Sequence, residues 1–429
     1  MNVHISERKV AAIRGISLFL NFFQIIFAYY MIKPASRSIY LEHFRADQLP
    51  YVWIASALLL GLLMPAYCHF VDRHDRRKVV MFSCQFFCAI LLIFVALLQS
   101  GKTSPAVAVG FYILVDILSV VLVEQFWSLT NSNYATHTGS RWYGFVGSGG
   151  LVGGILGGMA ASWLIRETAM TSYDLMLLSA FLLFTLGVYA ELLINLDIYS
   201  EESFHIRPQG LGNSLSFTRI FSNRYILLIT ITILLAQLVE PIVEYQFLSF
   251  VEQVYTEREA RTAYLSTFLS VLGMVALTIN LLLTPLVLRY LGAIGGMLFQ
   301  PVILLMASGY FNSSPGLSSG AAMKISDRGL SYSLNRASKE MLYVPVDPTL
   351  IYRAKAWIDM FGYRMFKIIG AVLVLALTQW FSFNWSSETF SYLVMPVCLV
   401  WILVVISLKP DYQRLRRHEQ TVVQSAMLT

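Results

Sequence analysis

Charged residues are scarce in this sequence. Asp, Glu, Lys and Arg make up 13% of its 429 residues, whereas soluble globular proteins typically carry about 25%. Hydrophobic residues make up 57%, and the mean hydropathy is +0.63. Apolar runs long enough to cross a bilayer as helices follow one another along the chain. These features exclude an ordinary soluble protein and predict an all-α membrane protein.

The sequence also lacks the motifs of membrane enzymes and ATP-driven pumps. It has no phosphate-binding loop, no H-E-x-x-H zinc motif and no G-x-S-x-G nucleophile motif in a suitable context. Cysteine is rare: Cys84 and Cys88 share a helix face, but no His or further Cys accompanies them. We therefore expect no enzyme activity, no metal and no cofactor. The net charge of +6 needs no nucleic-acid partner, because cytoplasmic loops of membrane proteins are basic.

Twelve apolar segments predict twelve transmembrane helices. They lie near 16–36, 50–71, 79–99, 105–130, 143–165, 174–196, 225–250, 262–288, 291–311, 318–345, 356–381 and 389–408. Fourteen Lys and Arg residues fall in the tails and connections on one side, against six on the other. Because Lys and Arg are enriched in cytoplasmic connections, we expect both termini in the cytoplasm and the protein in a bacterial inner membrane.

One long polar segment divides these spans six and six. We expect an N-terminal half at 1–196, a cytoplasmic linker at 197–224, a C-terminal half at 225–410 and a cytoplasmic tail at 411–429. Two six-helix halves joined in this way resemble the major facilitator architecture, which implies that spans one, four, seven and ten line a central cavity.

The connection between the second and third spans carries a dense group of charges. Its sequence, C-H-F-V-D-R-H-D-R-R-K, resembles the major facilitator loop G-x-x-x-D-R-x-G-R-R, with Asp72, Arg73, Arg76 and Arg77 in register. Such charges near helix ends can pair in one state and part in another, which makes them candidates for gating. The alternative is that they only anchor the loop on the cytoplasmic side.

Glycines recur at steps of three and four between Gly144 and Gly158. On a helix they form one smooth face, with Gly150 and Gly154 at its centre. In a soluble helix each would cost about 1 kcal/mol relative to Ala, whereas in lipid such a face lets a neighbouring backbone approach closely. The face indicates either fixed tight packing or a gating contact that slides between transporter halves.

Ionisable residues within spans are costly in lipid and usually face a cavity or one another. Asp116 and Glu124 share a face of span four, and Lys33 in span one is a candidate partner. Glu240 and Glu244 lie one turn apart in span seven. Two carboxylates so close disfavour simultaneous ionisation, which suits proton or cation coupling by Glu240 and Glu244. Asp116 and Glu124 are further candidates for coupling. The alternative for the span-seven pair is fixed pairing with a base of span ten or eleven.

A line of polar residues runs along span ten. Lys324, Arg328, Ser331, Asn335 and Lys339 follow steps of four, three, four and four, which places them on one face of a regular helix. The line is about 22 Å long. Its three cations need water, acids or an anionic substrate beside them, and a phosphate chain fits them well. The alternative is permanent neutralisation by Asp327, Glu340 and the acids of spans four and seven.

Two stretches resemble the ATP/ADP translocase family of plastids and intracellular bacteria. In the first, 126–150, Phe126, Trp127, Asn131, Arg141, Tyr143 and Gly147 match the family's F-W-x-x-x-N and R-F/W-Y-x-x-x-G segments. In the second, 331–367, the run S-K-E-M-L-Y-V-P-V-D resembles the family's K-E-M-x-Y-I-P-L-D. The resemblance implies nucleotide transport, with Lys33, Asn131 and Arg141 joining Lys324, Arg328, Asn335 and Lys339 as substrate-binding candidates.

Three departures from that family's pattern affect the expected substrate. Ser132 stands where the family has Glu, Pro34 where it has an acid after Lys, and Asn335-Arg336-Ala337 where it has Phe-Asp-Pro. Strict ATP-for-ADP exchange is therefore open, as is net import of a related anion. We predict a monomeric secondary transporter of a nucleotide or similar phosphorylated anion. The alternative is a proton-coupled major facilitator carrier for an unrelated solute such as a peptide, siderophore or drug.

Overall fold

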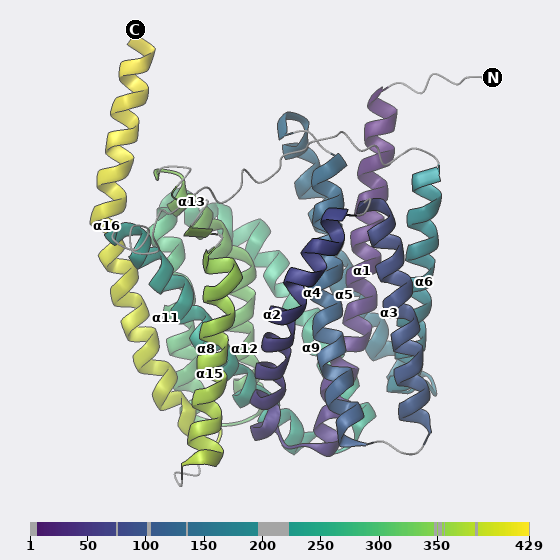
Figure 1. The fold of residues 1–429 in the computed structure, drawn as a ribbon. Helices are drawn as coiled ribbons and strands as arrows, with labels where there is room; N and C mark the ends of the chain where they lie inside the picture. The colour runs from purple at the N-terminus through teal and green to yellow at the C-terminus, as the bar shows by residue number, and fades with distance from the viewer. Residues whose placement is uncertain are drawn as a thin grey trace, which may run out of the picture. The chain divides into compact units, whose positions relative to one another are not determined.

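The computed structural model describes residues 7–73, 76–100, 104–133, 136–195, 223–346, 350, 354–355, 357–381 and 385–428. Within these residues the regular structure is entirely helical, which confirms the predicted all-α class (Figure 1). Eleven helical segments of the described chain are long and apolar enough to cross a membrane. The twelfth expected span is also helical, at Leu317–Tyr343, but carries the charged line of span ten. The protein is an integral multi-pass membrane protein.

The chain forms two compact units. Unit 1 comprises Met1–Arg45, Ala55–Arg207 and Tyr255–Gly273, and unit 2 comprises Ala46–Ile54, Pro208–Val254 and Met274–Thr429. The described helices of unit 1 are α1 (Glu7–His43), most of α2 (Leu49–Arg73), α3 (Arg76–Gln99), α4 (Pro105–Asn133), α5 (Thr136–Glu167), α6 (Ser172–Asn195) and most of α9 (Arg258–Thr278).

Unit 2 contains more irregular helices. They are η1 (Ala46–Gln48), the start of α2, α8 (Arg224–Val254), the end of α9, η2 (Ile279–Leu283), α10 (Thr284–Tyr290), α11 (Gly292–Ser313), α12 (Leu317–Leu330), η3 (Ser331–Asn335), α13 (Arg336–Tyr343), η4 (Ile358–Gly362), α15 (Tyr363–Leu375), η5 (Ala376–Trp380), η6 (Glu388–Phe390) and α16 (Ser391–Leu428). Four of these, η2, η3, η4 and η5, are single π-helical turns. Such turns re-aim the side chains that follow them and are frequent at functional sites.

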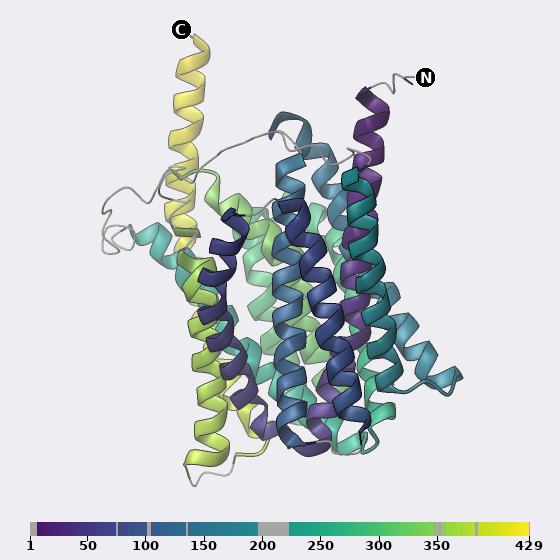
Figure 2. The same ribbon diagram turned by 45° about the vertical axis from the view of Figure 1, so that its right-hand side comes forward.

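The glycines of α5 pack against the backbone of α1 inside unit 1. A Cβ atom on Gly149 would lie 2.5 Å from the carbonyl oxygen of Phe19, and one on Gly157 would lie 2.6 Å from that of Phe27. Gly153 meets the Phe23 carbonyl in the same way. The two helices therefore approach so closely that no side chain fits between them, and they run side by side in both views (Figures 1 and 2).

The glycines of α5 differ in what a Cβ atom at each position would contact. Gly149, which lies outside the predicted face, contacts α1 at a step of four from Gly153. Gly150 lies against the ring of Phe22, and Gly154 would bring a Cβ atom to 3.2 Å from the ring of Tyr30. By contrast, a Cβ atom on Gly144 would meet nothing within 4 Å. In this structure Gly149, Gly153 and Gly157 pack against the backbone of α1, and the gating role of Gly150 and Gly154 stays a prediction.

Candidate functional site

Span seven and span ten face each other through ion pairs in unit 2. Lys324 of α12 pairs with Glu244 of α8, and Arg328 pairs with Glu240 one turn further along both helices. Lys367 of α15 adds a second cation to Glu240, with Nζ 2.8 Å from Oε1. Glu240 and Lys324 are buried, at 6% and 4% exposure. The two carboxylates of span seven are therefore each held by cations, as the alternative of fixed pairing required.

Asp327 lies beside these pairs and joins α12 to α11. Its Oδ1 accepts a 3.2 Å hydrogen bond from the amide of Gln300, which also donates to the Asp327 carbonyl. Gln300 in turn accepts a hydrogen bond of 2.5 Å from Asn335 Nδ2 in η3. All three residues are buried or half-buried. Asp327, Gln300 and Asn335 thus form a polar chain within the helical core. Such a chain is costly in apolar surroundings wherever its polar groups lack hydrogen bonds.

The predicted single polar face of span ten is interrupted. Lys324 and Arg328 reach α8, and Asn335 turns to α11. Lys339 reaches α15, where its Nζ donates to Tyr363 Oη at 3.1 Å. The cause is the π turn η3: it contains more residues per turn than an α-helix, so steps of three and four no longer keep residues after 331 in line with those before it.

Unit 1 contains a half-buried ion pair. Asp116 of α4 pairs with Arg37 of α1 at 2.7 Å, although the sequence suggested Lys33 as its partner. The guanidinium of Arg37 also stacks 4.2 Å from the ring centre of Tyr112. Lys33 Nζ lies over the rings of Tyr29 and Tyr30, at 5.4 and 5.7 Å. Glu124 is exposed on α4, two turns beyond Asp116.

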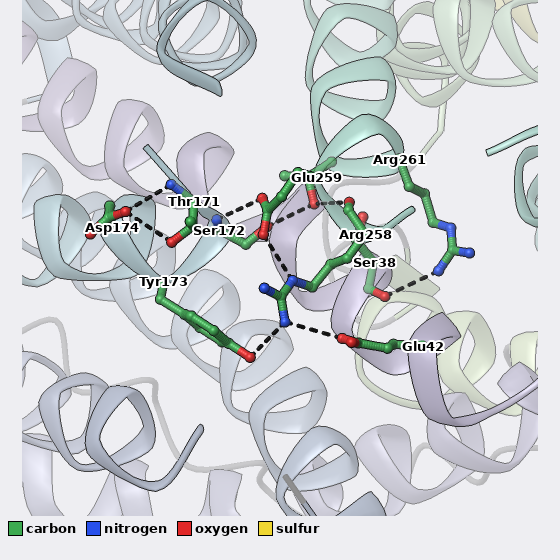
Figure 3. Close-up of polar contacts among 10 residues, drawn as sticks. Ser38, Glu42, Thr171, Ser172, Tyr173, Asp174, Arg258, Glu259 and Arg261 are labelled. Atoms are coloured by element: carbon green, nitrogen blue, oxygen red, sulfur yellow. Dashed lines mark hydrogen bonds and ion pairs between the residues drawn. The ribbon is translucent and has the colours of Figure 1, made fainter. Parts of the chain in front are cut away.

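A further cluster in unit 1 surrounds Arg258, the first residue of α9 (Figure 3). Arg258 Nη1 donates to Tyr173 Oη at 2.6 Å and pairs with Glu42 at 3.2 Å, while its Nε donates to Glu259 at 2.8 Å. Glu259 Oε2 also accepts hydrogen bonds of 2.7 Å from the backbone N–H and hydroxyl of Ser172, the first residue of α6.

The Arg258 cluster joins the end of α1 to the starts of α6 and α9. Arg261, which is 3% exposed, adds a bond to the Ser38 carbonyl of α1 at 3.2 Å. Sequence reasoning missed these residues because they sit at the ends of predicted spans, where charges are ordinary. The only local signal was the acidic and basic run at the start of α9.

Several predicted site residues lie outside the described side chains: Asp72, Arg76, Arg77, Asn131 and Arg141. Arg73 is exposed at the end of α2. Among the residues that the structure describes, no group of three or more His, Cys, Asp and Glu side chains could hold a metal ion.

Fold and site together define a helical membrane protein whose interior holds charged side chains in partnered sets. A model of the Major Facilitator Superfamily matches residues 18–326. The chain belongs to this superfamily. The predicted resemblance to ATP/ADP translocases is also confirmed, since a model described as TLC ATP/ADP transporter matches residues 316–412.

Curated relatives and solved structures agree with these matches. ADP,ATP carrier protein 1 of Rickettsia typhi is 28% identical over 221 residues, which cover 46% of this chain and 44% of the relative. ADP,ATP carrier protein 2 of Chlamydia pneumoniae is 22% identical, over 70% of this chain and 65% of the relative. The chain thus spans about half the length of the Rickettsia relative that it matches.

Among solved structures, the nucleoside transporter NupG covers 92% of this chain at a TM-score of 0.64 and 15% identity. A D-xylose-proton symporter gives a TM-score of 0.62, also at 15% identity. At such identities the likeness shows the fold alone.

Proposed function

We propose that this protein is a secondary transporter that moves a nucleotide or a similar phosphorylated anion by alternating access. The observation that carries the proposal is a set of three cations in unit 2 that pair with carboxylates of α8: the buried Lys324, the half-buried Arg328 and the exposed Lys367. The similarity to carriers named for ADP and ATP supports the substrate class.

The ion pairs suggest how an anion would bind. Each phosphate oxygen can replace a carboxylate oxygen at Arg328 or Lys324, because both ligands accept charge-assisted hydrogen bonds from the same donors. Such an exchange keeps the cations paired in both the empty and the loaded state, and Glu240 retains Lys367 when it releases Arg328. Lys339 has a neutral partner, Tyr363, so it can turn to a phosphate without leaving a carboxylate unpaired.

The remaining assignments belong to the same proposal. The protein acts as a carrier and not as an enzyme, lies in a bacterial inner membrane with both termini in the cytoplasm, and works as a monomer. Its two six-helix halves, 1–196 and 225–410, are joined by the linker 197–224. Transport proceeds by exchange or by ion-coupled movement of the anion, without a nucleic acid partner or a cofactor.

A second candidate is a major facilitator carrier for a solute without net charge. It is favoured by one observation: the named pairs of unit 2 contain three cations, Lys324, Arg328 and Lys367, and three carboxylates, Glu240, Glu244 and Asp327. A site of zero net charge has no overall preference for an anion.

Binding of radiolabelled ATP to the purified protein separates the two candidates. We expect ATP and ADP to compete for one site, and inorganic phosphate, nucleosides and sugars to compete weakly or not at all. Lys339→Gln should weaken ATP binding, whereas Lys355→Gln should not, since Lys355 pairs with the exposed Glu340. Saturable binding of a nucleoside or sugar with no binding of ATP would contradict the proposal and favour the second candidate.

A further inference from the structure

The acids of the unit 2 site differ in how they are neutralised. Glu240 has two cations, Arg328 and Lys367, and Glu244 has Lys324. Asp327 has no comparable partner: the nearest ion-pair contact that the described structure gives it is Arg328 Nε, 3.8 Å from Oδ2. Yet its side chain is only 3% exposed.

The hydrogen bonds of Asp327 are also weak. Oδ1 accepts from the neutral amide of Gln300 at 3.2 Å, the long end of the normal range. Oδ2 accepts no hydrogen bond within the described part of the chain. Asp327 is therefore the carboxylate of the site whose burial is least compensated, because Glu240 and Glu244 each have a closer cation.

The surroundings of Asp327 connect its charge to the proposed substrate. On its own helix it lies between Lys324 and Arg328, the two cations that we assign to the anion. From α8, Glu244 lies within electrostatic range of Asp327, and from α15, Lys367 does.

The other neighbours of Asp327 carry no charge of their own at neutral pH. Cys398 of α16 lies within electrostatic range of Asp327, and α11 contributes the neutral Gln300. An anion at Lys324 and Arg328 would therefore place its charge next to Asp327, with few other groups to offset it.

We infer that Asp327 is the proton-binding residue of this transporter and that it takes up a proton when the anion binds. The inference rests on the proposed function. With Asp327 ionised, the three cations Lys324, Arg328 and Lys367 and the three carboxylates sum to zero charge; with Asp327 protonated they sum to +1, and Lys339 adds one further positive charge, which favours an anion. By thermodynamic linkage, anion binding and protonation then strengthen each other. The Glu240 and Glu244 pair, predicted from the sequence to couple ions, instead serves as the exchangeable counter-charge.

The test measures the affinity of the purified protein for ADP between pH 6 and pH 9, in wild type, Asp327→Asn and Glu340→Gln. Uptake of one proton with the anion makes the dissociation constant for ADP rise by up to about tenfold for each unit by which the pH increases. We expect this rise in wild type and in Glu340→Gln, whose exposed acid pairs with Lys355. Asp327→Asn mimics the protonated acid and should bind ADP tightly. The pH dependence of its affinity should be no larger than ionisation of the ADP phosphates alone causes.

A second measurement counts protons directly. Addition of ADP to weakly buffered wild type above pH 7.5, where phosphate groups with a second pKa near 6 are fully ionised, should draw protons from solution. Equal pH dependence of ADP binding in wild type and Asp327→Asn would overturn the inference. If Asp327→Asn cannot be produced as folded protein, the absence of proton uptake by wild type would overturn it. If ADP binds to neither variant at any pH, the proposed function fails as well, and the two failures are thereby distinguished.

Discussion

Arg37 of α1 and Asp116 of α4 lie 2.7 Å apart in a largely buried ion pair of unit 1, with side-chain exposures of 11% and 22%. Arg37→Gln would leave the carboxylate without its cation and remove the contact with the Tyr112 ring. Breaking such a pair from one side is strongly destabilising, because the remaining charge is poorly solvated. We expect a loss of about 2 kcal/mol in the free energy of unfolding, measured by denaturation of the purified protein in detergent.

The double variant Arg37→Gln/Asp116→Asn provides the control for this pair. It removes both charges, so most of the lost stability should return. If the double variant loses as much free energy of unfolding as the two single variants lose together, Arg37 and Asp116 do not stabilise one another.

The glycine contacts of α5 predict that a larger side chain lowers stability by different amounts at different positions. Gly157→Leu would drive a side chain into the Phe27 backbone, which cannot move without parting α1 from α5. Gly154→Leu meets the Tyr30 ring, which can shift, so its effect should be smaller. Gly144→Leu, with open space around it, should be neutral. Heating followed by size-exclusion chromatography should rank the three proteins in this order, and an unstable Gly144→Leu would show that the α1–α5 contact is not the cause.

Glu259 supplies an N-terminal cap for α6 from another helix. Its carboxylate accepts the backbone N–H and the hydroxyl of Ser172, and anions at a helix N-terminus are stabilising. Glu259→Ala should therefore cost about 1 kcal/mol, measured by denaturation in detergent. Glu257→Ala, at an exposed position two residues earlier, is the matched control. Equal stability of the two variants would mean that the Arg258 cluster does not hold α6.

The sequence predicted the helical class and nearly all spans, because long apolar runs are unambiguous. It also located the acids of α8 and the bases of α12, since charges in apolar spans are rare. It could not predict partners: Lys33 and Arg37 lie one turn apart on α1, and only the packing of α4 places Asp116 beside Arg37. The π turn η3 has no reliable sequence signature, so the interruption of the polar line was missed. The Arg258 cluster joins residues more than 200 positions apart.

Arg328 and Lys339 should respond differently to the same substitution, although the sequence placed both on one line. Arg328→Gln leaves the buried Glu240 with Lys367 as the one cation remaining among its ion pairs in the described part of the chain, so it should reduce stability as well as substrate binding. Lys339→Gln loses a bond to the neutral Tyr363 hydroxyl and a cation–π contact with the same ring, but no carboxylate is left unpaired. It should raise the apparent KM for a polyphosphate substrate about tenfold, equivalent to about 1.4 kcal/mol, with little change in stability. Uptake by proteoliposomes and denaturation of the same preparations test both parts. A Lys339→Gln protein that is unstable but transports with unchanged KM would make Lys339 structural and would remove it from the anion site.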